Sequence, residues 1–343
     1  MIESRSEIRT NSAGNVSPVL SVRDLSIGFQ GEDGMVGITD RISFELRPGE
    51  ILGIAGESGS GKTVTALALL RLLPQPDGAV LGGSVRFQDR EVLNMSHTEL
   101  RGMRGAGISM IFQEPSSAMN PLMTVRRQLN EVFEYHDFDG NPETRINDLM
   151  HRVGFADADR ILDSYPHQLS GGMLQRVMIA MALLLHPSVI IADEPTTALD
   201  VTVQAQIMEL LVQLQKEAGA AVILITHNLG LIAQYADRLA IMYAGRIVEE
   251  APIESFLKDP LHPYSEGLIN ALPDLSRPRS ELQPIRGQVP RPVNFPAGCR
   301  FRARCDHAFD PCDKQPELTL PSNASADGKH RVACFLHHNE VVR

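Results

Sequence analysis

The sequence lacks the features that would direct it into a membrane or onto nucleic acid. None of its apolar runs reaches the roughly 20 residues that span a bilayer. Residues 1–17 are polar and lack the apolar stretch of a signal peptide, so we expect a disordered N-terminus and a cytosolic chain. Positive charge is scarce, because 32 Lys and Arg face 42 Asp and Glu, for a net charge of -10. This balance argues against a general nucleic-acid binder.

Cysteine is missing from the first 298 residues, and all four cysteines lie beyond them. In a reducing compartment this clustering favours a metal site over disulfides. The chain is otherwise ordinary, with 343 residues, 43% hydrophobic content and 22% charged content. That length predicts two domains, or one large domain with an appendage.

A phosphate-binding loop pattern, G-x-x-x-x-G-K-T, occupies residues 56–63. Its residues are Gly56, Glu57, Ser58, Gly59, Ser60, Gly61, Lys62 and Thr63. The glycines let backbone N–H groups cradle phosphate oxygens, Lys62 adds a charge for the β- and γ-phosphates, and the Thr63 hydroxyl can ligate Mg²⁺. A buried strand at 51–55 and a helix at 64–73 flank the loop, which an ordinary glycine-rich turn would not require.

The rest of the chain alternates between strands and helices, which predicts an α/β fold with a largely parallel sheet. We expect half-exposed antiparallel strands at 20–29 and 42–46, joined by a loop at 31–37, and further strands at 84–87, 108–112, 189–195 and 221–226. Helices are expected at 173–185 and 204–217, and a terminal hairpin at 239–243 and 246–249.

Two segments stand apart from this alternation. Residues 114–170 read as a helical insertion broken by prolines, with its best helices at 124–135 and 143–153. Residues 256–343 hold eleven of the 22 prolines and read as a separate, irregular appendage.

Together these motifs resemble the nucleotide-binding subunit of an ABC (ATP-binding cassette) transporter. GESGSGKT is similar to the Walker A motif, Gln113 to the Q-loop, LSGGMLQR to the ABC signature, VIIADEP to Walker B, TALD at 197–200 to the D-loop, and ITH at 225–227 to the switch histidine. The resemblance covers about residues 18–255. It implies a P-loop NTPase cassette with a mostly parallel core sheet, an antiparallel β subdomain and a helical subdomain at about 114–170.

The resemblance also assigns roles around ATP and Mg²⁺. Glu194 would accept a proton from the attacking water or orient it, while Asp193 would hold Mg²⁺. Gln113 would reach the metal and the water, and His227 the γ-phosphate. Phe29 is a candidate to stack on adenine, with core packing as the open alternative.

The signature residues have a different role in such proteins. Ser170, Gly171 and Gly172 precede the helix at 173–185, which makes an anion-binding helix start. The resemblance implies that they bind the γ-phosphate held by an opposite ATPase subunit, so a monomer would hydrolyse ATP poorly. Met173 stands where Gln is more usual, and the three preceding residues are intact.

The appendage narrows the subfamily. HPY at 262–264 and GCRFRARC at 298–305 resemble the C-terminal extension of oligopeptide/dipeptide importer ATPases, a group that includes nickel and other small-solute importers. The implied partners are a second ATPase subunit, two membrane permeases and an extracytoplasmic binding protein, at the cytoplasmic face of the inner membrane. The open alternatives are an exporter or other-solute subunit, a DNA-repair or translation ABC protein, a subunit without turnover, and a tail with incidental cysteines.

The four cysteines are expected to bind a 4Fe–4S cluster, with zinc or free thiols as alternatives. They are Cys299, Cys305, Cys312 and Cys334, separated by gaps of five, six and 21 residues rather than by close C-x-x-C pairs. Arg300, Arg302 and Arg304 could offset the negative charge of bound thiolates. We expect a structural role for this site, because nothing in the sequence places the appendage near the ATP site.

Overall fold

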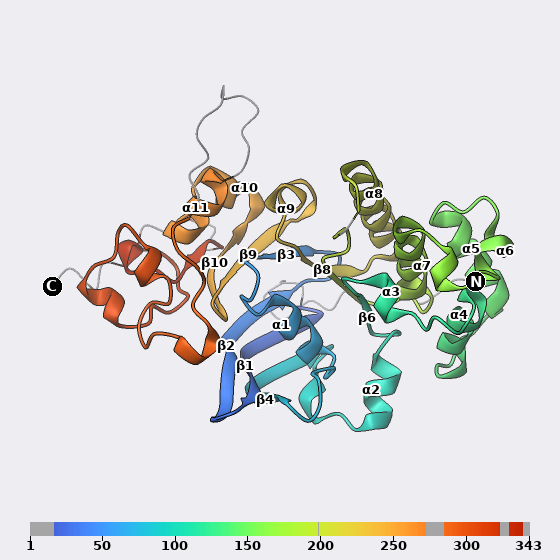
Figure 1. The fold of residues 1–343 in the computed structure, drawn as a ribbon, viewed down its shortest axis with the longest axis horizontal. Helices are drawn as coiled ribbons and strands as arrows, with labels where there is room; N and C mark the ends of the chain where they lie inside the picture. The colour runs from blue at the N-terminus through green and yellow to red at the C-terminus, as the bar shows by residue number, and fades with distance from the viewer. Residues whose placement is uncertain (1–16, 198, 272–284, 323–328, 339–343) are drawn as a thin grey trace. The chain divides into compact units, whose positions relative to one another are not determined.

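The structure is a computed structural model that describes residues 17–197, 199–271, 285–322 and 329–338 (Figure 1). The chain divides into two compact units. One contains residues 1–21, 45–50 and 86–224, and the other contains residues 22–44, 51–85 and 225–343. The predicted disordered segment 1–17 falls almost entirely outside the described residues.

The unit that contains residues 51–85 is built on strands in the order β11-β10-β9-β3. Their bounds are Ile51–Ala55 for β3, Arg238–Tyr243 for β9, Arg246–Pro252 for β10 and Arg331–Val332 for β11. β3 runs parallel to β9, with Gly53 opposite Leu239, and the next two pairs are antiparallel. The predicted terminal hairpin is therefore confirmed, and the distant segment β11 extends it by one strand.

The same unit holds most of a second sheet, in which β1 (Leu20–Gly31) lies between β2 (Gly34–Leu46) and β4 (Gly78–Phe87). The expected loop at 31–37 is wrong, because β1 and β2 are joined by a two-residue turn at Glu32 and Asp33. Four helices accompany the sheets: α1 (Lys62–Leu69), α9 (Leu229–Tyr235), α10 (Ile253–Lys258) and α11 (Pro263–Asn270). Helix α1 begins two residues earlier than expected and ends four residues earlier.

The other unit contains strands in the order β8-β7-β6, with bounds Ala221–Ile225, Val189–Asp193 and Ile108–Ile111. β6 and β7 are parallel, and every residue of the three strands is buried. Helices α7 (Gly171–Leu183) and α8 (Val201–Ala218) confirm the helices expected at 173–185 and 204–217. The short elements β5 (Arg90–Glu91) and α2 (His97–Met103) precede β6 and were not predicted.

A group of helices fills the interval between β6 and α7, as the proline-broken pattern predicts. They are α3 (Pro115–Ala118), α4 (Val125–Glu134), α5 (Pro142–Arg152) and α6 (Ala158–Leu162), and α4 and α5 both pack against α7 (Figure 1). The Arg126 guanidinium holds three of them together, since it pairs with Glu143 of α5 and with Asp159 and Asp163 at α6.

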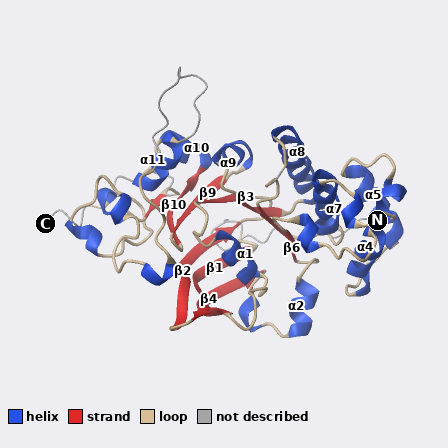
Figure 2. Cartoon of the chain, viewed as in Figure 1, coloured by secondary structure: helices blue, strands red, loops and turns tan. Residues whose placement is uncertain are grey.

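Beyond α11 the described chain is mostly loop with short helical turns (Figure 2). The buried carboxylate of Glu249 on β10 anchors the residues that lead into α11. It accepts hydrogen bonds of 2.8 Å from the backbone N–H groups of Leu261 and His262 and contacts His330 Nε2 at 2.7 Å. These hydrogen bonds hold the pKa of Glu249 below its usual value, although burial opposes ionisation. None of the described helices is long and apolar enough to cross a membrane.

Candidate functional site: an ATP-binding loop and a facing C-terminal extension

The predicted phosphate loop lies between β3 and α1, and all three of its glycines adopt backbone conformations that other residues avoid. Gly56 has a φ of 153° and Gly61 a φ of 99°. A Cβ at Gly56 would clash with the carbonyl oxygen of Met242, and one at Gly61 would lie 2.8 Å from Cγ2 of Thr39. Glycine is therefore required at both positions for the loop to turn into the N-terminus of α1.

Lys62 is the first residue of α1 and is buried, with 7% of its surface exposed. Its ammonium folds back over the loop, donating to the carbonyl oxygens of Gly56 at 2.8 Å and Glu57 at 3.0 Å and to Ser60 Oγ at 3.4 Å. Ser58, Gly59 and Thr63 are exposed at the rim of the loop. The loop thus combines a fixed cation with accessible N–H and hydroxyl groups, which is the chemistry of a phosphate site.

The two adjacent carboxylates lie at the end of β7 in the other unit. Asp193 is the last residue of this fully buried strand, and Glu194 follows it with a left-handed φ of 45°. The Glu194 carboxylate accepts hydrogen bonds from Thr197 Oγ1 at 2.7 Å and from Gln113 Nε2 at 3.2 Å. The structure therefore brings together Gln113 and Glu194, two of the predicted catalytic residues, and holds Glu194 in a conformation that costs backbone energy.

The predicted histidine and aromatic residue lie in the same unit as the phosphate loop. His227 is exposed and follows β8, next to Asn228, whose side chain caps α9 by accepting from the N–H groups of Gly230 and Leu231. Phe29 on β1 is half-buried, and a Cβ at Gly78 would lie 3.2 Å from its ring. Adenine stacking by Phe29 stays a prediction.

The signature residues open α7 as expected. Ser170 is the N-cap, and its hydroxyl accepts a hydrogen bond from the Met173 N–H at 3.3 Å. Ser170 and Gly171 are exposed, so this helix start is available to a ligand from outside the unit. Of the predicted D-loop, position 198 lies outside the described residues, and Asp200 caps α8 by accepting from the Val203 N–H at 3.0 Å.

All four cysteines line one pocket, although Cys334 is 22 residues from the nearest of the others in sequence. The walls between them include Phe301, His307 and Phe335. Burial raises the pKa of the Cys299 and Cys305 thiols, and that of Cys334 to about 12. Among the described residues, no three His, Cys, Asp or Glu side chains are grouped closely enough to hold a single metal ion.

The three arginines between the first two cysteines each pair with a different carboxylate. Arg304 pairs with Glu57 at 2.8 Å, Arg300 with Asp40 at 2.8 Å, and Arg302 with Asp313. Arg302 is also among the residues that line the cysteine pocket, and the expectation that the three arginines offset thiolate charge stays a prediction. The structure places the appendage at the phosphate loop, since Glu57 belongs to that loop, so the ground on which only a structural role was expected does not hold. The alternating arginines at 300, 302 and 304 are the sequence feature that marks these contacts, but their position between two cysteines points to the cysteines and not to the carboxylates.

A family model described as ABC transporter matches residues 39–197. The chain is 45% identical over 341 residues to the oligopeptide transport ATP-binding protein OppD of Salmonella typhimurium. The aligned region covers 99% of this chain and 100% of that protein. The chain belongs to the ABC transporter family of ATP-binding proteins. Its fold is accordingly that of an ABC ATPase cassette, for which ATP and Mg²⁺ are the expected ligands.

Three further comparisons agree with this assignment. A second family model, described as the oligopeptide/dipeptide transporter C-terminal region, matches residues 248–312. The oligopeptide transport ATP-binding protein AppD of Bacillus subtilis is 40% identical over 95% of this chain and 98% of its own length. Among solved structures, a dimeric ATP-binding cassette, MJ0796, in a post-hydrolysis state with ADP and Pi has a TM-score of 0.61 at 25% identity, over 68% of this chain and 98% of that one.

Proposed function

We propose that this chain is the ATP-hydrolysing subunit of an importer that takes up peptides across the cytoplasmic membrane. The observation that carries the proposal is the match of residues 248–312 to the oligopeptide/dipeptide transporter C-terminal region, beyond the cassette itself. OppD and AppD, which resemble the chain along nearly its whole length, are named for oligopeptide transport. The proposed domains are the cassette at 18–255 and the extension at 256–343.

The proposed ATP chemistry divides between the described groups. The loop at 56–63 holds the phosphates, with Lys62 as the fixed cation and Thr63 as a ligand of Mg²⁺. Asp193 and Gln113 complete the metal's surroundings, and Glu194 orients and deprotonates the attacking water. The contacts of Glu194 with Thr197 and Gln113 support this role, because they fix the carboxylate before any substrate binds. His227 senses the γ-phosphate.

The signature is proposed to act on a second ATPase subunit. Ser170, Gly171 and Gly172 complete the ATP site of that partner, which the exposure of Ser170 and Gly171 permits. The similar cassette MJ0796 was solved as a dimer with ADP and Pi. The assembly would then comprise two ATPase subunits, two permeases and an extracytoplasmic binding protein, with this chain peripheral at the cytoplasmic face of the membrane.

The cysteine pocket is proposed to hold a 4Fe–4S cluster. Four thiols converge on one pocket, which suits a ligand that takes four thiolates. When bound, the cluster would cross-link a segment that has little core of its own.

The decisive experiment reconstitutes the chain with candidate permeases and a candidate binding protein from the same organism. We expect ATP hydrolysis stimulated by the loaded binding protein and uptake of labelled oligopeptides that depends on ATP. Uptake of Ni²⁺ without peptide uptake would instead assign a small-solute importer. Failure to associate with any permease, together with capture of DNA or ribosomes, would contradict the proposal.

A further inference from the structure

Glu57, the second residue of the phosphate loop, is held from two sides by the C-terminal extension. Its backbone N–H donates to the Tyr264 hydroxyl at 2.9 Å, and its carboxylate pairs with Arg304 Nη1 at 2.8 Å. Tyr264 and Arg304 lie 207 and 247 residues further along the chain. The loop that receives the phosphates is therefore in direct contact with a segment that lies outside the matched ABC cassette.

Arg304 is fixed in place before it reaches Glu57. Only 8% of the residue is exposed. Its Nε donates to the carbonyl oxygen of Arg286 at 2.7 Å, and its guanidinium lies over the rings of Tyr243 and Phe301 at 5.6 and 5.8 Å. A buried, pre-oriented guanidinium forms a stronger pair with a carboxylate than a flexible surface arginine does.

Tyr264 is equally constrained. The residue is fully buried, and its ring packs against Tyr243 and Phe301 with centroids 4.7 and 5.5 Å apart. Its backbone N–H donates to His262 Nδ1 at 3.0 Å. Burial raises the pKa of the phenol, so the hydroxyl stays neutral and accepts the Glu57 N–H as a fixed group.

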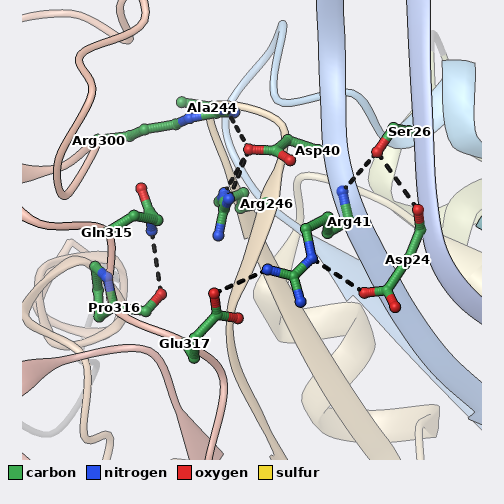
Figure 3. A network of polar contacts seen from close by, with 10 residues as sticks. All are labelled: Asp24, Ser26, Asp40, Arg41, Ala244, Arg246, Arg300, Gln315, Pro316 and Glu317. Atoms are coloured by element: carbon green, nitrogen blue, oxygen red, sulfur yellow. Dashed lines mark hydrogen bonds and ion pairs between the residues drawn. The ribbon is translucent and has the colours of Figure 1, made fainter. Parts of the chain in front are cut away.

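A second series of contacts connects the extension to the same loop through the turn between β9 and β10. Arg300 pairs with Asp40 and donates to the carbonyl oxygen of Ala244, and Arg246 pairs with the same Asp40 oxygen (Figure 3). Gly245 lies between Ala244 and Arg246 in this turn, and its N–H donates to the carbonyl oxygen of Ser60 in the phosphate loop at 3.0 Å. Two arginines of the R-F-R-A-R run therefore support the loop, one directly and one through this turn.

We propose that Arg304 and Tyr264 are positioning residues for ATP binding, a role that rests on the proposed function of this loop. The Glu57 carboxylate stands on a loop that must receive a highly negative triphosphate, and alone it would repel that ligand. Arg304 neutralises the Glu57 carboxylate, and Tyr264 fixes the Glu57 backbone by accepting its N–H. The loop therefore keeps a backbone shape and a net charge that favour phosphate binding. Neither residue needs to touch the reacting atoms.

This proposal predicts opposite effects for the two members of the ion pair. Arg304→Met keeps the aliphatic bulk but leaves the Glu57 charge unpaired, so the Kd for ATP should rise about tenfold at low salt. Glu57→Gln leaves a buried cation beside the phosphates, so the Kd should fall. A purely structural pair would weaken ATP binding in both variants. The double variant should regain most of the affinity lost by Arg304→Met.

The measurement is an equilibrium titration of the full chain with a fluorescent ATP analogue, alongside thermal unfolding. Arg302→Met is the matched control, because Arg302 lies in the same helical turn and pairs with Asp313 instead. Tyr264→Phe, which keeps the ring and removes the hydroxyl, should raise the Kd about threefold. If Arg304→Met does not fold, Glu57→Gln and Tyr264→Phe still test the proposal by the sign of their effects.

Lys62→Ala separates this inference from the proposed function. If Lys62→Ala abolishes binding while Arg304→Met and Tyr264→Phe bind as wild type, the positioning role is overturned and the ATP site stands. If the double variant binds as weakly as Arg304→Met, Arg304 acts through the fold and the inference is again overturned. Wild-type binding by Lys62→Ala would overturn the ATP site itself.

Discussion

The side-chain amide of Gln113 donates to the carboxylate of Glu194, with 3.2 Å between Nε2 and Oε2. The two residues are 81 positions apart. Gln113 is the second residue after β6, and Glu194 directly follows β7, the neighbouring strand of the same sheet. Because these strands are parallel, their carboxyl ends meet at one edge of the sheet and bring the two side chains together. This edge is where the candidate water-activating group lies.

Replacing Glu194 by Gln should stop turnover without stopping ATP binding. The amide keeps the size of the carboxylate and its contact with Thr197 but cannot accept a proton, so kcat should fall by about 10²- to 10⁴-fold. Single-turnover hydrolysis by the assembled complex measures the loss. Normal turnover by this variant, with loss in Asp193→Asn, would show that the roles of the two carboxylates are reversed.

Removing the fixed cation of the phosphate loop should abolish transport. Lys62→Ala deletes the ammonium that bridges Gly56 and Glu57, and the Kd for ATP should rise at least about tenfold while the fold is retained. Lys258→Ala, at an exposed position on α10, is the control and should bind ATP normally. ATP binding by calorimetry and circular dichroism spectra of both variants test this expectation.

The signature is best tested at Gly171. A Cβ there would lie 3.6 Å from the nearest side chain, an ordinary contact, whereas at Gly172 it would lie 3.1 Å from Val203. Gly171→Glu should therefore fold, leave the ATP affinity of the isolated chain unchanged, and block hydrolysis at the partner's site by charge repulsion. A large loss of affinity in the isolated chain would show that the signature acts within its own subunit.

The cysteine pocket has a direct chemical test. Protein purified without oxygen should be brown, with iron and acid-labile sulfide each near four per chain. Cys305→Ser should lose the colour and loosen the extension, which limited proteolysis would detect. Colourless protein with one zinc ion would assign the pocket to zinc, and four titratable thiols without metal would remove the site.

Glu249 should be a major anchor of the extension. Glu249→Ala leaves the N–H groups of Leu261 and His262 and the His330 side chain without this acceptor, and we expect a loss of about 3 kcal/mol in the free energy of unfolding. Glu254→Ala, at an exposed position on α10, should change stability by less than about 0.5 kcal/mol. Urea unfolding of the two variants compares them directly, and equal stabilities would contradict this role.

The sequence alone determined the parts of this protein whose signals are local. A buried strand, a glycine-rich loop and a helix are consecutive in the chain, so 51–73 could be interpreted without knowing any distant partner. The same holds for the strand that ends in Asp193 and Glu194 and for the cap at Ser170. Each of these signals rests on residue type and on a period of two or 3.6 residues.

Only the tertiary structure decided what the extension contacts. Its loops have no period, so nothing in the sequence indicated that β11 pairs with β10 or that Arg304 and Tyr264 meet Glu57. Charge alone could not choose partners for Arg300, Arg302 and Arg304, because the chain holds 42 carboxylate side chains and the path of the backbone selects among them. That path decides contacts between residues more than 200 positions apart, such as those of Tyr264 and Arg304 with Glu57 in the phosphate loop.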